Sequence, residues 1–153
     1  MAPKKKNPRF EAFRILASME KDRADLQETL AGSIIRNPSM DRRDVSLMTN
    51  IVYGVTRRHL ALNGVLSRFL DLPVGRLDVE TATLLRAGAF QILYLSRVPA
   101  YAVVNESVNL AKKIKPASAG LINAVLKKVC AHGKETLCAL DVWTRASLPQ
   151  MTL

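Results

Sequence analysis

The sequence predicts an all-α protein of about six to eight helices. Apolar residues recur at intervals of three and four along most of the chain, and no segment alternates long enough for a half-buried strand. Aromatic residues make up only 5% of the sequence, so the core must consist mainly of Leu, Val, Ile and Ala. With 153 residues, 48% of them apolar, the chain is long enough for one domain with its own core.

Three helices are predicted in the first half of the chain, after a basic tail. Residues 1–8 contain three consecutive lysines and end in Pro8, and they are expected to be a disordered tail before the domain. Asp41 precedes an apolar repeat and is the expected N-cap of the third helix, which continues with a kink beyond Arg58. The expected helices span residues 9–22, 24–35 and 42–69.

Three further helices are predicted in the second half. Asp78 is the expected N-cap of the first, and Pro99 suits the first position of the second. The third helix is expected to turn Leu121 and its apolar neighbours inward and to end at Gly133, which leaves residues 133–153 as a linker or tail. The expected helices span residues 79–95, 99–115 and 118–131, and the folded domain spans residues 9–132.

Basic residues are in clear excess, because 23 Lys and Arg face 13 Asp and Glu and give a formal net charge of +10. This balance favours a polyanionic partner, with nucleic acid ahead of an anionic membrane surface; the alternative is a solvated surface with no partner. The excess is concentrated in residues 1–60 and 99–134. The candidate RNA-binding residues are Lys4, Lys5, Lys6, Arg9, Arg14, Arg57, Arg58, Lys112, Lys113, Lys127 and Lys128. Phosphate contacts supply affinity rather than sequence choice, and Tyr53 and Tyr101 are the candidates for base stacking, although both are expected to be partly buried.

The residue patterns of common catalytic and metal sites are missing. The seven glycines are spread out, with the nearest pair ten residues apart, so no glycine-rich phosphate loop is possible. The spacing of Cys130 and Cys138 matches neither a redox motif nor a zinc site, and the two histidines lack a metal-binding pattern. We therefore expect no metal, no cofactor and no catalysis by this chain alone. The absence of a signal peptide and of an apolar run of about 20 residues predicts a cytoplasmic protein that does not enter a membrane.

Several polar residues lie inside the apolar helices, where a structural role is favoured over RNA contact. Gly88 is expected to let two helix backbones approach closely. Gln91 falls on the inward face and needs a hydrogen-bond partner, for which the backbone near residues 97–99 is a candidate. Arg86 is expected to pair with Glu106 in the same network. The side-chain amides of Asn105 and Asn123 are expected to tie helix ends together across the two halves of the fold.

Four segments resemble the motifs of a known family, and they occur in the same order and at the same spacing as in that family. They are VYGVTRR at 52–58, RAGAFQILY at 86–94, RVPAYAVVNE at 97–106 and GLINAVLKK at 120–128. Together they resemble the NusB-like RNA-binding domain over residues 8–130. That domain occurs alone as an antitermination factor and as the N-terminal part of 16S rRNA cytosine-C5 methyltransferases. The resemblance implies a helical bundle of two three-helix halves. Lys127 and Lys128 replace the family's usual arginine pair, which keeps the charge but loses bidentate phosphate geometry.

The variant resembles the methyltransferase domain more closely than the free factor. The segment 144–150 is similar to the linker that precedes the catalytic part, while Cys130 and Cys138 do not match the catalytic motifs. The resemblance thus implies an RNA-binding domain that docks 16S rRNA for a methyltransferase domain in cis. One alternative is a free antitermination factor that binds leader RNA with a ribosomal protein. The other is a protein-interaction module whose charge serves solubility.

Overall fold

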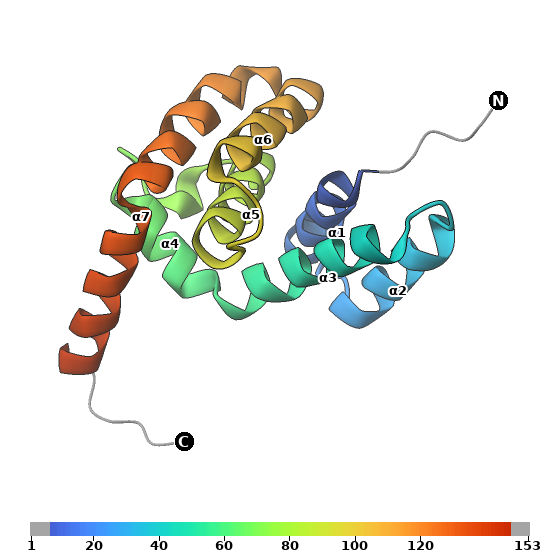
Figure 1. Cartoon of the computed structure of the whole chain (residues 1–153), viewed down its shortest axis with the longest axis horizontal. Coiled ribbons are helices and arrows are strands. Elements are labelled where there is room, and N and C mark those ends of the chain that lie inside the picture. Colours follow the sequence, from blue (N-terminus) through green and yellow to red (C-terminus); the bar gives the residue numbers. More distant parts are fainter. Residues whose placement is uncertain (1–6, 148–153) are drawn as a thin grey trace.

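The computed structural model describes the backbone of residues 7–147 and the side chains of residues 7–140, and within these residues it contains helices and no strand. The all-α prediction is therefore confirmed (Figure 1). The α-helices are α1 (Pro8–Asp22), α2 (Leu26–Arg36), α3 (Arg42–Arg57), α4 (His59–Ser67), α5 (Val79–Tyr94), α6 (Ala100–Ile114) and α7 (Ala119–Ser147). Two short 3₁₀ helices, η1 (Val74–Arg76) and η2 (Pro116–Ser118), precede α5 and α7.

Short polar side chains begin four of these helices by accepting hydrogen bonds from backbone N–H groups that have no partner within the helix. The N-cap residues are Asn7 for α1, Asp25 for α2, Asp41 for α3 and Asp78 for α5. Asp41 and Asp78 are the caps that the sequence predicts. Pro8 lies within α1, at its first position, rather than at the end of the predicted tail, because a proline there gives up an N–H that the helix does not use. Pro99, predicted as the first residue of a helix, is instead the N-cap of α6, which begins at Ala100.

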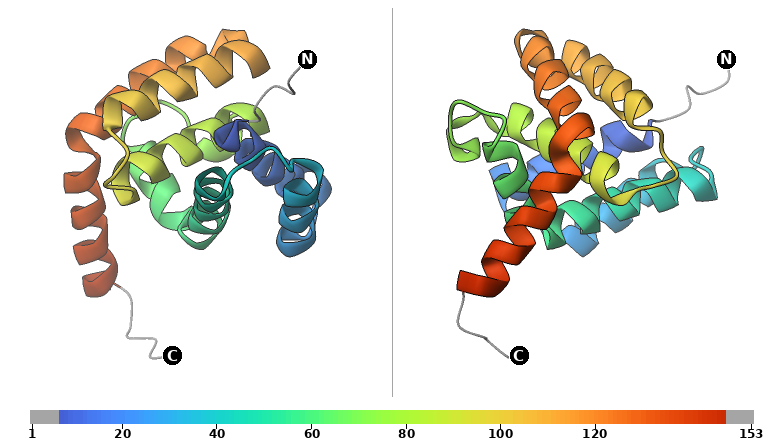
Figure 2. Two further views of the ribbon diagram at one scale, coloured as in Figure 1. Left: turned by 45° about the vertical axis from the view of Figure 1, so that its right-hand side comes forward. Right: turned by 60° about the vertical axis from the view of Figure 1, so that its left-hand side comes forward.

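Helices α1–α3 form one half of the predicted bundle and α5–α7 form the other, and α4, which follows α3 in the chain, packs mainly on α5 and α7 of the second half. Helix α5 is central in this arrangement, because it packs against α1 and α3 of the first half as well as against α4, α6 and α7 (Figures 1 and 2). Every residue from Thr81 to Gln91 is consequently buried, which gives the molecule its core. The apolar face of α5 includes Leu84, Leu85 and Phe90.

Two glycines on this core permit close packing of side chains. A Cβ atom on Gly54 of α3 would lie 2.0 Å from Cζ of Phe90 on α5, so the phenyl ring occupies the place of the missing side chain. A Cβ atom on Gly88 would lie 2.7 Å from Cδ1 of Leu126 on α7 and 3.1 Å from Oγ of Ser107 on α6. The predicted close approach at Gly88 is thus to side chains of two helices rather than to a helix backbone.

The C-terminal helix is much longer than the sequence predicts, because α7 continues through Gly133 to Ser147. Gly133 is buried, and a Cβ atom there would lie 2.9 Å from Cγ1 of Val129 and 3.0 Å from Cδ2 of Leu93. The glycine therefore serves close packing and does not end the helix. Beyond it, Leu140 packs near Gly64 of α4, and this contact supports the extra turns.

Three other details of the sequence prediction are wrong. The predicted helix over 42–69 is two helices, α3 and α4, separated at Arg58. Leu121, expected inward, is 40% exposed, because the inward stripe of α7 starts at Ile122 and continues through Val125, Leu126 and Val129. Helical spacing in the sequence predicts that Leu26, Leu30 and Ile34 share one inward face of α2, but Ile34 is exposed whereas Leu30 is buried.

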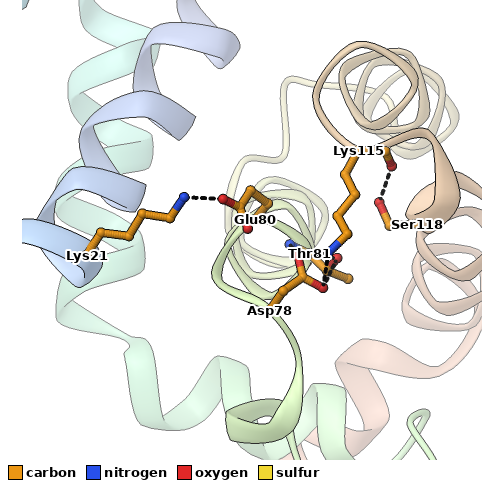
Figure 3. Close-up of polar contacts among 6 residues, drawn as sticks. All are labelled: Lys21, Asp78, Glu80, Thr81, Lys115 and Ser118. Atoms are coloured by element: carbon orange, nitrogen blue, oxygen red, sulfur yellow. Dashed lines mark hydrogen bonds and ion pairs between the residues drawn. The ribbon is translucent and has the colours of Figure 1, made fainter.

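Ion pairs at the N-terminal end of α5 link it to α1 and to the end of α6 (Figure 3). Lys21 of α1 pairs with Glu80, and Lys115 at the end of α6 lies 3.1 Å from Asp78 Oδ1. Burial raises the pKa of Asp78, but hydrogen bonds from the backbone N–H and hydroxyl of Thr81, together with the Lys115 ammonium, outweigh it and lower that pKa to about 2. The Lys21 ammonium likewise lowers the pKa of Glu80.

Candidate nucleic-acid interface

The buried arginine of the second motif has a structural role, with partners different from the predicted one. Arg86 is only 6% exposed, and its guanidinium donates to Glu20 Oε1 of α1 at 2.8 Å and to Asn63 Oδ1 of α4 at 2.9 Å. The predicted pair with Glu106 is wrong, since Glu106 forms no ion pair among the side chains of residues 7–140. Because Arg86 lies on α5, this network joins three helices.

Gln91 is buried on the inward face, as predicted, but its partner is not the backbone of residues 97–99. Its side-chain amide donates to the carbonyl of Ala87 at 3.1 Å, and its Oε1 accepts from Nε of Arg9 at 2.7 Å. Arg9, a candidate RNA-binding residue, is therefore half-buried and engaged in holding α1 against α5. The predicted ties through Asn105 and Asn123 are absent, because within residues 7–140 neither side chain makes a hydrogen bond.

Helices α6 and α7 form a surface, the Tyr101 face, with a small cavity at its centre. The cavity has a volume of about 260 Å³ and is lined by Ala100, Tyr101, Val104, Asn105, Lys127 and Cys130. Tyr101 is 73% exposed, so the expectation that it is partly buried is wrong. An open aromatic ring next to an ammonium group and an amide can stack on a nucleobase while the ammonium binds a phosphate.

The structure brings only part of the predicted second basic cluster to the Tyr101 face. Lys127 lines the cavity, and Lys128 follows it as an exposed residue on α7. Lys112 and Lys113 are exposed in the last turn of α6, eleven residues or about 17 Å along the helix from Tyr101. These two lysines therefore belong to a separate part of the surface.

A larger groove lies between α3 and the turn at residues 95–99 that joins α5 to α6. It consists of two cavities, of about 930 and 450 Å³, which share Asn50, Tyr94 and Leu95 in their walls. Five arginines line it, and we call it the arginine groove: Arg42, Arg43, Arg57, Arg58 and Arg97. Its walls include no Asp or Glu.

An aromatic stack supports the middle of the arginine groove. The guanidinium carbon of Arg58 lies 4.5 Å from the ring centroid of Tyr94. Tyr94 in turn stacks on Phe90 with a centroid distance of 5.5 Å and an interplanar angle of 24°. Since Phe90 fills the space above Gly54, the motifs at 52–58 and 86–94 interlock to set the floor of this groove.

The sequence identified two of the five groove arginines, Arg57 and Arg58, and missed Arg42, Arg43 and Arg97. The available signals are the adjacent pair Arg42-Arg43 at the start of α3 and Arg97 as the one charged residue of the turn at 95–99, but only the fold brings these two segments together. Tyr53, which also lines the groove, is half-buried as expected.

The remaining candidates lie away from both surfaces or outside the described residues. Arg14 is exposed on α1, where its guanidinium lies 3.5 Å from Glu11 Oε1. Lys4, Lys5 and Lys6 lie outside the described residues.

The described residues also give two negative findings. Among them, no group of three or more His, Cys, Asp and Glu side chains is placed to hold a metal ion. No helix within the described part of the chain combines the length and apolar character needed to cross a membrane.

Comparisons with known proteins agree on one family. The model of the NusB family matches residues 6–131. Ribosomal RNA small subunit methyltransferase B of Pseudomonas putida is 32% identical over 136 residues, which is 88% of this chain and 30% of that protein. The chain therefore spans less than a third of the length of this relative.

Two solved structures share the fold. T. maritima NusB has a TM-score of 0.75 at 20% identity, covering 86% of this chain and 93% of that one. NusB from the complex of antitermination factors NusB and NusE with dsRNA has a TM-score of 0.74 at 17% identity, covering 82% and 94%.

Proposed function

Because this chain belongs to the NusB family, we propose that it is an RNA-binding domain that docks 16S rRNA for a cytosine-C5 methyltransferase module. The similarity to a ribosomal RNA small subunit methyltransferase over 88% of this chain supports this reading. The domain supplies affinity and placement of the RNA, and the catalytic step and its methyl donor belong to the module outside the matched segment. We assign the protein to the cytoplasm, where ribosomal RNA is processed.

The Tyr101 face is the observation that carries the proposal. An aromatic ring that is 73% exposed in the first turn of α6 has no packing role to explain it. Lys127 and Asn105 stand beside it, and Ala100 and Val104 provide an apolar floor. This combination suits one unpaired base with its phosphate, because stacking on an aromatic side chain contributes about 1–3 kcal/mol per base and tolerates any base.

The basic residues predicted from the sequence add phosphate contacts at this centre and farther along α6. Lys127 lines the cavity and Lys128 follows it on α7, whereas Lys112 and Lys113 lie about 17 Å away along α6, on a separate part of the surface. Each exposed lysine by itself is equally explained by solvation, so the proposal depends on their joint field and not on any one of them.

A second candidate function is that of a free antitermination factor binding leader RNA together with a ribosomal protein. It is favoured by the coverage of 93% of T. maritima NusB, which means that the fold accounts for nearly all of a free factor. A protein-interaction module is the third reading, and it is separated from both by the absence of salt-dependent RNA affinity.

The Tyr101 face is tested by fluorescence anisotropy with a labelled RNA that contains an unpaired loop. Tyr101→Ala removes the stacking ring and is expected to weaken binding by about 5- to 150-fold, whereas Tyr101→Phe keeps the ring and retains affinity. Leu60→Ala is the matched control, because Leu60 is 84% exposed on α4 and lines neither surface. If Tyr101→Ala binds RNA as tightly as the parent chain, the Tyr101 face is not the binding surface.

A further inference from the structure

We propose that the arginine groove binds the phosphate backbone of a single-stranded RNA segment, as a second contact surface distinct from the Tyr101 face. This inference rests on the proposed RNA-binding function. It specifies that the bound RNA is single-stranded and where its backbone lies on the domain. The occupant is identified by four properties of the groove: its charge, the availability of its arginines, its extent and its continuity with the Tyr101 face.

The walls of the groove contain five arginines and no carboxylate, and the nearest carboxylates in the sequence are Asp41 and Asp44, which flank Arg42 and Arg43 at the start of α3. The arginines come from both ends of α3 and from the turn at 95–99. Among the side chains of residues 7–140, four of them form no ion pair: Arg42, Arg43, Arg57 and Arg97. All four are exposed, so their guanidinium groups can bind an external anion without breaking a contact within the protein. A planar guanidinium fits a phosphate with two parallel hydrogen bonds, which favours phosphate over a diffuse acidic surface.

The extent of the groove favours a single strand. Double-stranded RNA is bound mainly by shape across its wide minor groove over about 16 base pairs. The groove is lined only by α3, the end of α5 and one short turn, which is a small surface for such a duplex. The ring of Tyr94 is already engaged by Phe90 and by Arg58. The groove therefore offers guanidinium groups along its length rather than an open ring, and this suits phosphates better than bases.

The groove also leads toward the Tyr101 face. Arg97, in the wall of the groove, precedes Tyr101 by four residues, and the turn at 95–99 runs directly into the first turn of α6. In the right-hand view of Figure 2 this turn lies alongside α3 before α6 begins. A strand with its phosphates in the groove can thus pass over the turn and place its next base on Tyr101.

The test uses the full chain, a labelled single-stranded RNA and a titration of salt. Arg42→Ala combined with Arg97→Ala removes two phosphate contacts. The slope of log affinity against log salt concentration should become shallower by about 1.4, because each phosphate contact to a single strand contributes about 0.7. The change in affinity between 1 M and 0.1 M salt should therefore be about 25-fold smaller than in the parent chain. Arg42→Lys combined with Arg97→Lys keeps both charges, so the slope stays the same while affinity falls a few-fold because bidentate contacts are lost.

The matched control is Arg68→Ala combined with Arg76→Ala, which removes two exposed arginines outside both surfaces. The groove inference requires a larger loss of slope for the groove pair than for this control, with unchanged melting curves for both. If the two pairs behave alike while Tyr101→Ala still weakens binding, the groove inference is wrong and the proposed function stands.

If no variant binds RNA and neither does the parent chain, the proposed function itself fails. An acidic peptide of poly-glutamate is then titrated against the parent and the groove pair. Binding that the groove pair loses would assign the groove to a protein partner and overturn the RNA inference.

Discussion

Removing the carboxylate of Glu20 should destabilise the fold, because it leaves a buried guanidinium with one protein acceptor. Arg86 is 6% exposed, and among the side chains of residues 7–140 its guanidinium donates to Glu20 and Asn63 alone. Breaking a fully buried ion pair costs about 3–5 kcal/mol. The Glu20 side chain is 37% exposed, so water replaces part of the lost contact and lowers the expected cost of Glu20→Ala to about 2 kcal/mol.

A double-mutant cycle separates this pair from the one that the sequence suggested. Arg86→Met keeps most of the apolar stem and removes the charge. Urea denaturation followed by circular dichroism gives the unfolding free energy of each variant. We expect a coupling of about 1–2 kcal/mol between Arg86→Met and Glu20→Ala, and a coupling below about 0.5 kcal/mol between Arg86→Met and Glu106→Ala.

The reverse pattern would refute the reasoning. A coupling above about 1 kcal/mol with Glu106, or an additive result with Glu20, would mean that the buried guanidinium has a different partner in solution. Unequal m-values among the variants would invalidate the comparison, since the unfolded states would then differ.

Three further predictions concern stability. Gly54→Ala should destabilise the protein by about 1–3 kcal/mol in thermal melts despite the better helix propensity of alanine, because its Cβ collides with Phe90; adding Phe90→Leu should recover part of the loss. Asp78 has a folded pKa of about 2, below its ordinary value of 3.8, so its stabilisation is complete above about pH 5 and disappears as the pH falls through 2. After allowance for its partial exposure this contribution is about 1–2 kcal/mol. Asp78→Asn keeps the cap but loses the pair with Lys115, so the unfolding free energy from urea denaturation should vary less between pH 2 and 6 than in the parent chain. Backbone amides at 134–140 should show slow hydrogen exchange, as expected for a helix packed on α4, whereas exchange at the rate of an unstructured tail would contradict the continuous α7.

Local chemistry explains why much of the fold was predictable. An N-cap such as Asp41 or Asp78 acts on N–H groups three residues away, and the apolar spacing of a helix lies within one segment. The burial of Gln91 follows from the same periodicity. These features need no knowledge of which segments meet in space.

Contacts between distant segments explain the errors. Gln91 binds Arg9, which is 82 positions away, and Arg86 binds Glu20, which is 66 positions away. No local pattern favours these partners over nearer ones such as Glu106. The end predicted for α7 at Gly133 is wrong for the same reason. A glycine commonly follows the last turn of a helix. Here the side chains of Val129 and Leu93 leave no room for a Cβ atom, so the glycine is needed inside a continuous helix.

The candidate interface was predictable in charge but not in position. Net charge and two basic clusters follow from counting, and they led to Arg57, Arg58 and Lys127. The arginine groove depends on the turn at 95–99 lying beside α3, and the exposure of Tyr101 depends on how α6 packs against α7. Both are consequences of tertiary packing, which composition does not specify.

The central claim is tested most directly by titrating the chain with two RNAs at two salt concentrations. One RNA is a small-subunit rRNA hairpin with an unpaired loop, and the other is a linear leader-type RNA of equal length. We predict salt-sensitive binding that favours the hairpin, as expected for the docking domain of an rRNA methyltransferase. Preference for the linear RNA would instead support an antitermination factor. Failure to bind either RNA at low salt would contradict the account and leave the protein-interaction module.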